Sequence, residues 1–267
     1  MLSGINDQTF YYPDMVMNGN QPIFSYCNDN NGLTYRTTGD AASNSLIGRW
    51  FERMTAMARN TSGTYYIVSG EDAFSGASIG FLQLNYGDKT NGGGGTGAMI
   101  GDGGAYPGVN GVIELAGYDW DGTAGAGSTD SRQLNRFKYP NIIVEGTDAG
   151  TQVYISYFDS HPDRQQIQFF SFRTTGATTD NLTEPNQDYR IASNGNLTVP
   201  GTASASSRFT AMTMIGSEIA IAYYDETNAQ LKLRYSSNHT TGNLANTGST
   251  WTELVVDSSP FCGLYVS

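Results

Sequence analysis

The residues of this chain best suited to chemistry are carboxylates that follow aromatic pairs. Asp159 ends the stretch "VYISYFD" and Asp225 ends "IAIAYYD". Two carboxylates about 5–9.5 Å apart across a sugar could act as the acid and base of a glycosidase. An Asp at the start of a tight turn can instead accept a hydrogen bond from the backbone two residues on. Because the same Asp recurs in several hairpins, while a catalytic acid is needed once, we expect Asp159 and Asp225 to be turn caps.

A second acidic group lies within a glycine-rich segment, residues 87–135. The stretch "DWDG" places Asp119 and Asp121 two residues apart, and Asp130 follows. Alternating carboxylates of this kind are typical of calcium loops, although the closing Glu is missing at the expected distance. Two interpretations stay open: a calcium site at Asp119, Asp121 and Asp130, or a plain acidic turn.

The same segment carries the best candidates for ligand binding. Trp120 lies beside the glycine run, and exposed aromatic rings stack well on sugars while carboxylates bind hydroxyls. Loops on a rigid scaffold often carry function, so the segment would shape a binding site; a flexible surface loop is the alternative. The candidate set is Tyr118, Asp119, Trp120 and Asp121.

Charge and hydropathy exclude several classes of partner. The net charge of the 267 residues is −11, and such a surface repels phosphate backbones and anionic membranes, so we expect no nucleic-acid partner. No apolar run approaches the ~20 residues that a transmembrane helix needs. The first ten residues have neither the basic nor the apolar region of a signal peptide. We expect the chain to belong to a longer polypeptide.

The two cysteines, Cys27 and Cys262, lie near opposite ends of the chain. They could be unrelated thiols, or they could form a disulfide that joins the first and last parts of a ring. A disulfide would imply an oxidising compartment.

The elements that must position these residues are short strands joined by many turns. The 17 Tyr and 33 Gly, with only 15% charged residues, suit that structure and not long helices. The strands also repeat in sequence, and repeats determine the architecture. The matching stretches are Tyr12–Pro13 with Tyr139–Pro140, Ser25–Tyr26 with Ser156–Tyr157, Arg36–Gly39 with Arg173–Gly176, and Thr55–Ala56–Met57 with Thr210–Ala211–Met212.

The repeats predict one all-β domain over residues 1–267, a β-propeller built from four-stranded antiparallel blades. A β-helix would need shorter, more uniform repeats, and a sandwich would not repeat its hairpins. In each unit the fourth strand is the weakest prediction; these strands are expected around residues 46–51, 112–118, 189–193 and 251–256. The predicted units are residues 11–50, 51–135 with the glycine-rich insertion at 87–135, 138–205, 207–257 and a partial fifth unit at 258–267.

Two hairpins and one turn carry a resemblance to a known group. The hairpins are Tyr223–Tyr224–Asp225 with Leu231 to Tyr235, and Tyr157–Phe158–Asp159 with Ile167 to Phe172. The turn "NTGSTW" is similar to a degenerate Asp box, with Asn246, Gly248 and Trp251 in place and Leu244 where Ser belongs. Together they resemble the repeats of bacterial secreted and surface β-propellers of the sialidase-like group.

The resemblance implies an extracellular or cell-surface location, and it raises sialidase activity as an alternative. Sialidases of this group use an Arg cluster, a Tyr nucleophile with a Glu, and an Asp acid. Arg36, Arg173 and Arg234 fall at the ends of third strands, away from the axis, so the chain departs from that pattern. We therefore expect a non-enzymatic recognition or adhesion module whose partner is a glycan or a cell-surface protein. The alternatives are a glycoside hydrolase or sialidase and a purely structural repeat.

Overall fold

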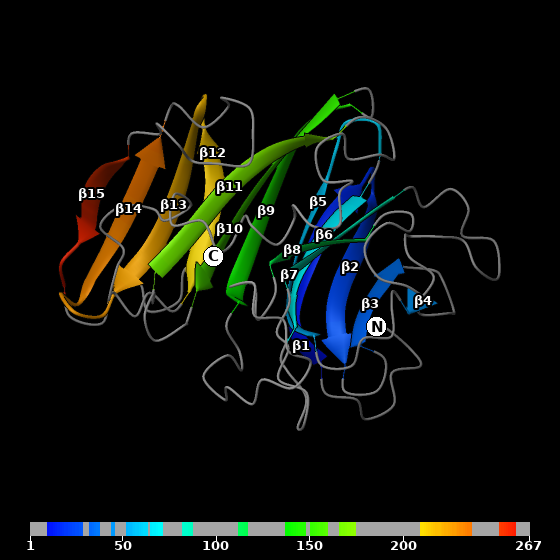
Figure 1. The fold of residues 1–267 in the computed structure, drawn as a ribbon, viewed down its shortest axis with the longest axis horizontal. Helices are drawn as coiled ribbons and strands as arrows, with labels where there is room; N and C mark the ends of the chain where they lie inside the picture. Colours follow the sequence, from blue (N-terminus) through cyan, green and yellow to red (C-terminus); the bar gives the residue numbers. More distant parts are fainter. Residues whose placement is uncertain are drawn as a thin grey trace, which may run out of the picture.

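The computed structural model describes strands and the turns between them (Figure 1). Within the described ranges, no helix is long and apolar enough to cross a bilayer. The all-β prediction is confirmed for this part of the chain. The described residues are 10–28, 32–37, 44–45, 52–63, 65–71, 82–87, 112–116, 137–147, 150–159, 166–174, 209–236 and 251–259.

The strands form four separate antiparallel sheets, and within each sheet consecutive strands are neighbours. Sheet 1 contains β1 (Phe10–Asn18), β2 (Gln21–Asn28), β3 (Gly32–Thr37) and β4 (Asn44–Ser45). Sheet 2 contains β5 (Glu52–Arg59), β6 (Tyr65–Glu71), β7 (Leu82–Gly87) and β8 (Val112–Ala116). Sheet 3 contains β9 (Phe137–Thr147), β10 (Gly150–Asp159) and β11 (Gln166–Thr174). Sheet 4 contains β12 (Thr210–Ile215), β13 (Glu218–Asp225), β14 (Gln230–Ser236) and β15 (Thr252–Asp257).

The sheets follow one another in space in the order of the sequence. The first strand of each sheet contacts the first strand of the next: β1 lies against β5, β5 against β9, and β9 against β12. In Figure 1, sheets 3 and 4 occupy the left of the view and sheets 1 and 2 the right. The first strands therefore form the inner row of the molecule, and the later strands of each sheet lie farther out.

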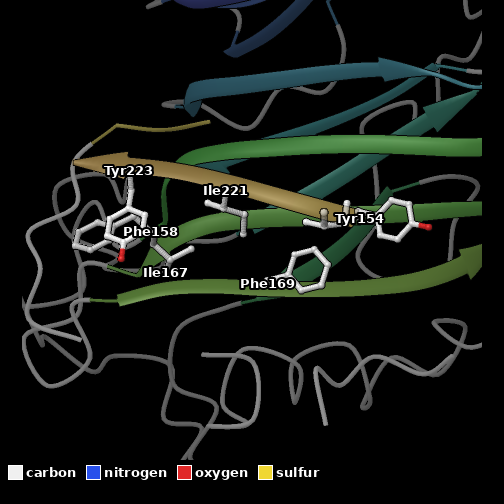
Figure 2. Packing of buried hydrophobic residues seen from close by; sticks show 7 residues of the cluster. Tyr154, Phe158, Ile167, Phe169, Ile221 and Tyr223 are labelled. Carbon is white, nitrogen blue, oxygen red and sulfur yellow. The ribbon is translucent and has the colours of Figure 1, made fainter. Parts of the chain in front are cut away.

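A described hydrophobic core lies between sheets 3 and 4 (Figure 2). It forms because β13 is apolar on both faces, as the alternation of "IAIAYY" predicts, so that it is buried from Ile219 to Ile221 and from Tyr223 to Asp225. Trp251 closes the cluster with its ring edge-on to Phe169, at a centroid distance of 5.3 Å. The buried members of this cluster are Tyr154, Phe158, Ile167, Phe169, Ile219, Ile221 and Tyr223.

A bulge at a Tyr-Pro pair recurs in β1 and β9. The pairing of β1 with β2 shifts register between Tyr11 and Asp14, and that of β9 with β10 shifts opposite Tyr139 and Pro140. Proline has no N–H to donate to a ladder, so it is placed where the ladder is interrupted. The residue after each pair, Asp14 or Asn141, then bonds to the neighbouring sheet.

Gly146, in the turn between β9 and β10, is required by its backbone. Its φ is +100°, and an added Cβ would lie 2.5 Å from the carbonyl oxygen of Gly150. We expect Gly146→Ala to lower the free energy of unfolding by about 2–3 kcal/mol. The equivalent residue in sheet 1, Gly19, has φ +57° with nothing within 4 Å, so Gly19→Ala should cost only about 1 kcal/mol. Urea unfolding of both variants checks the order; equal losses would contradict the close approach at Gly146.

Candidate functional site

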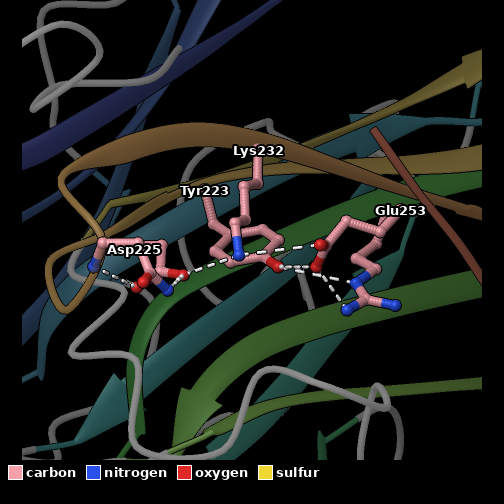
Figure 3. A network of polar contacts seen from close by, with 6 residues as sticks. Tyr223, Asp225, Lys232 and Glu253 are labelled. Carbon is pink, nitrogen blue, oxygen red and sulfur yellow. Dashed lines mark hydrogen bonds and ion pairs between the residues drawn. The ribbon is translucent and has the colours of Figure 1, made fainter. Parts of the chain in front are cut away.

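A charged network in sheet 4 surrounds Asp225, one of the two carboxylates that the sequence singled out. It lies across β13, β14 and β15 (Figure 3). Antiparallel pairing places Tyr223 opposite Lys232 and Arg234 opposite Glu253, which brings side chains from three strands together. The charged network consists of Tyr223, Asp225, Asn228, Lys232, Arg234 and Glu253.

Asp225 begins the turn between β13 and β14 and is almost fully buried. Its Oδ1 accepts a hydrogen bond from the backbone N–H of Asn228 at 3.1 Å, and its Oδ2 accepts one from the Asn228 side chain at 2.8 Å. Lys232 Nζ lies 2.7 Å from the same Oδ2. Burial alone would raise the pKa of Asp225, but the hydrogen bonds from Lys232 and Asn228 outweigh it and hold the pKa below its usual value. Asp225 is thus kept ionised.

Lys232 sits between two carboxylates. Its Nζ pairs with Asp225 and lies 3.6 Å from Glu253 Oε1, while its side chain is 10% exposed. Burial alone would lower the pKa of Lys232, but the hydrogen bond and charge of Asp225, together with the charge of Glu253, raise it. The ammonium group is therefore charged over the whole physiological range of pH.

The outer half of the network joins Glu253 to Tyr223 and Arg234. Glu253 forms an ion pair with Arg234, and the Tyr223 hydroxyl lies 3.3 Å from Glu253 Oε2, to which it donates. Arg234 Nε lies 3.5 Å from the Tyr223 hydroxyl. Burial raises the pKa of Tyr223. The phenol therefore stays protonated, which is the opposite of what an activated phenolate nucleophile requires.

In the charged network, Asp225 is not in the protonation state of a general acid, and Tyr223 is not in that of a phenolate nucleophile. A glycosidase acid needs a carboxyl whose pKa is raised so that it keeps its proton. Asp225 has its pKa shifted in the other direction, and Tyr223 is fully buried. The expectation that Asp225 is a turn cap is confirmed, with the backbone bond reaching Asn228, three residues on instead of two.

Some residues of the network were not anticipated from the sequence, Lys232 and Glu253 among them. Lys232 and Glu253 lie on strands that could be recognised, but their partners come from other strands. The available signal was a Lys within the apolar stretch "LKLRY" of β14, where a buried cation needs an anion across the sheet.

Asp14, which is half-buried, is the second carboxyl of interest, and it joins sheet 1 to sheet 2. Its Oδ2 accepts a hydrogen bond from the backbone N–H of Met57 in β5, and its Oδ1 accepts one from Met15 at 2.8 Å. Burial raises the pKa of Asp14, and the two backbone donors only partly offset this. Asn141, at the matching position of the repeat, also bonds to the neighbouring sheet, but as a donor: its Nδ2 donates to Thr210 Oγ1 of sheet 4 at 3.0 Å.

The other predicted site residues lie beyond what the structure describes. The backbones of Asp159 and Cys27 belong to β10 and β2, but their side chains are outside the described set, as is Cys262. Calcium binding, ligand binding and the disulfide therefore stay predictions. Among the side chains that are described, no three His, Cys, Asp or Glu residues cluster closely enough to hold a metal ion. Also outside the described residues are Tyr118, Asp119, Trp120, Asp121 and Asp130.

Comparison with known proteins gives only distant similarities. No protein-family model matches the sequence, and no curated protein matches it. Among solved structures, a thermostable family-43 glycoside hydrolase shares 10% identity over 94% of this chain and 73% of its own, with a TM-score of 0.47. A protein of unknown function from Dyadobacter fermentans DSM 18053 shares 11% over 92% and 69%, with a TM-score of 0.49. The Hadza microbial sialidase Hz136 shares 10% over 92% and 46%, with a TM-score of 0.43. Similarities at this level assign no activity to the chain.

Proposed function

We propose that this chain is a non-catalytic recognition module whose binding site lies on loops carried by a rigid array of sheets. The observation that supports it most directly is the state of Asp225, the carboxylate whose sequence context best suited catalysis. Lys232 and Asn228 bind both of its oxygens and keep it ionised. A carboxylate engaged in this way stabilises a hairpin and has no proton to give to a leaving group.

The architecture we propose for the module is a β-propeller. Successive antiparallel sheets with consecutive strands side by side, and with their first strands in an inner row, are arranged as propeller blades are. Such a disc presents many turns on rigid strands, which is a suitable base for recognition of a partner. The number of blades is part of the proposal.

The ligand class we propose is carbohydrate, bound by the glycine-rich segment. This rests on the sequence, because Tyr118 and Trp120 offer stacking surfaces while Asp119 and Asp121 offer hydroxyl acceptors. The sialidase-like resemblance supports an extracellular or cell-surface setting within a longer polypeptide.

Glycan binding by wild-type chain and Trp120→Ala tests this function. We expect wild-type binding on a glycan array, confirmed by calorimetry, and a loss of about tenfold or more in Trp120→Ala, since one aromatic–sugar stack contributes on the order of 1–2 kcal/mol. Thr252→Ala, at an exposed position of β15, is the control that should bind normally. An unchanged melting temperature shows that each variant is folded. An array without hits would favour a purely structural repeat.

A glycoside hydrolase is the second candidate, and Asp14 is the observation in its favour. Burial raises the pKa of this carboxyl, as it does for a general acid. The same glycans should therefore be screened for hydrolysis. Turnover that disappears in Asp14→Asn or Asp225→Asn would establish this candidate and contradict the non-catalytic proposal.

A further inference from the structure

Each inner strand between two sheets has two covered faces, and β9 is the clearest case. Asn141 and Ile143 face sheet 4, where Asn141 bonds Thr210 and Ile143 packs against the core of sheets 3 and 4. Because side chains alternate along a strand, Pro140, Ile142 and Val144 point the other way, toward β5 and β6 of sheet 2. Ile142 is accordingly only 8% exposed.

The corresponding face of β1 is open. The repeat aligns Pro13, Met15 and Met17 of β1 with Pro140, Ile142 and Val144 of β9. Asp14, between them, faces sheet 2 and bonds Met57. Met15 and Met17 are 50% and 51% exposed. We call Pro13, Met15 and Met17 the β1 face; among the described residues, no sheet covers it as β5 and β6 cover its counterpart on β9.

The complementary face is open at the other end of the array. The repeat aligns Ala211, Thr213 and Ile215 of β12 with Ala56, Ala58 and Asn60 of β5. Their neighbours Met212 and Met214 pack toward sheet 3. We call Ala211, Thr213 and Ile215 the β12 face.

Inside the array, the β5 counterpart of the β12 face is bonded to sheet 3. Asn60 is 3% exposed, and its Nδ2 donates to Thr151 Oγ1 at 3.0 Å. The next residue, Thr61, donates both its backbone N–H and its hydroxyl to the carbonyl oxygen of Gly146. Ile215, at the position of Asn60, is 54% exposed. Sheets 1 and 4 thus each expose one side of the contact that sheets 2 and 3 make inside the molecule.

We propose that the β12 face of one molecule packs on the β1 face of a second copy of this chain, continuing the sheet-to-sheet interface across molecules. Neither face contains a charged residue, although the chain has a net charge of −11 that opposes self-association elsewhere on the surface. A second copy is the partner that fits, because it supplies the very face that covers the equivalent position inside the array. The contact is head-to-tail, because it joins unlike faces of the two copies. About a two-fold axis the two copies form this contact twice, which closes the dimer.

Oligomeric state in solution tests this interface. Light scattering coupled to size-exclusion chromatography at micromolar concentration should give a dimer for the wild-type chain. Met17→Asp and Ile215→Asp should each raise the dimer dissociation constant about tenfold or more, because each places a charge in an apolar contact. Val256→Asp, at a residue 52% exposed on β15, is the matched control and should leave the dimer intact. A monomeric wild-type chain overturns the proposal, and so does a dimer that survives both substitutions or dissociates with Val256→Asp.

Crosslinking keeps the proposal testable if an aspartate variant fails to fold. Met17→Cys and Ile215→Cys are prepared separately, mixed, and treated with a short bismaleimide, with the background from Cys27 and Cys262 measured on wild-type chain. We expect more covalent dimer in the mixture than in either variant alone. A crosslink across the interface needs one cysteine on the β1 face and one on the β12 face, and only a mixed pair of molecules supplies both. No gain in the mixture overturns the head-to-tail contact. A double variant that crosslinks within one molecule also overturns it, because the two faces would then meet in a single chain.

Discussion

Replacing Phe169 by Ala should lower the free energy of unfolding by about 4 kcal/mol. Phe169 lies on β11, is 1% exposed, and contacts Trp251 edge-to-face between sheets 3 and 4. Truncation removes a ring from a cluster that includes Tyr154 and Ile221, whose strands are fixed by their ladders and cannot move to fill the space. The cost therefore combines lost burial with a cavity.

Urea unfolding followed by tryptophan fluorescence measures this effect, since Trp251 reports directly on the site. Leu254→Ala, at a residue 52% exposed on β15, is the control and should change stability by no more than about 0.5 kcal/mol. A double-mutant cycle between Phe169→Ala and Ile221→Ala should be non-additive, because the two residues share one cluster across the two sheets. If Phe169→Ala costs no more than the control, sheets 3 and 4 do not pack through this cluster.

The hairpins of sheets 3 and 4 could be predicted from the sequence because their signal is local. The stretch "IAIAYYD" is apolar at odd and even positions alike, which predicts a strand covered on both faces, and β13 is buried accordingly. The following polar residues predict the turn that Asp225 caps. Strand, turn and cap all lie within one short stretch.

The outer strands could be predicted only in part. The expected fourth strands near Val112 and Trp251 correspond to β8 and β15. The strands expected at 46–51 and 189–193 lie outside the described residues, and β4 (Asn44–Ser45) ends just before the first of them. An outer strand has one neighbour and little burial, so its apolar periodicity is weak.

The contacts between sheets could not be predicted, although the repeat held a trace of them. Tyr-Pro followed by Asp14 or Asn141 was visible as a match between units. Its meaning depends on a bulge that aims the next side chain at another sheet, and the partner of Asp14, Met57, is 43 residues away. Pairings at that separation are set by the packing of whole sheets, which one sequence does not encode locally.

Lys232→Met should lower the free energy of unfolding by about 3 kcal/mol near neutral pH. Met keeps most of the volume of the side chain but removes the cation that neutralises Asp225, whose side chain is 6% exposed. Asn228 still bonds the carboxylate, yet a buried charge without a counter-ion is costly. Lys138→Met, which removes a charge from a half-buried position of β9, is the control and should cost less than about 1 kcal/mol.

The dependence of this loss on pH identifies its cause. The pKa of Asp225 is lowered from 3.8 on folding, so its contribution to stability is present above that value and is lost as pH falls through the folded pKa. The pKa of Lys232 is raised from 10.5, so its contribution is present below that value and is lost as pH rises through the folded pKa. The difference in stability between wild type and Lys232→Met should therefore be largest between these limits and shrink beyond both. A double variant, Lys232→Met with Asp225→Asn, should recover part of the loss because no unpaired charge is left. A pH-independent difference, or losses that simply add in the double variant, would mean that Lys232 stabilises sheet 4 by packing and not by its charge.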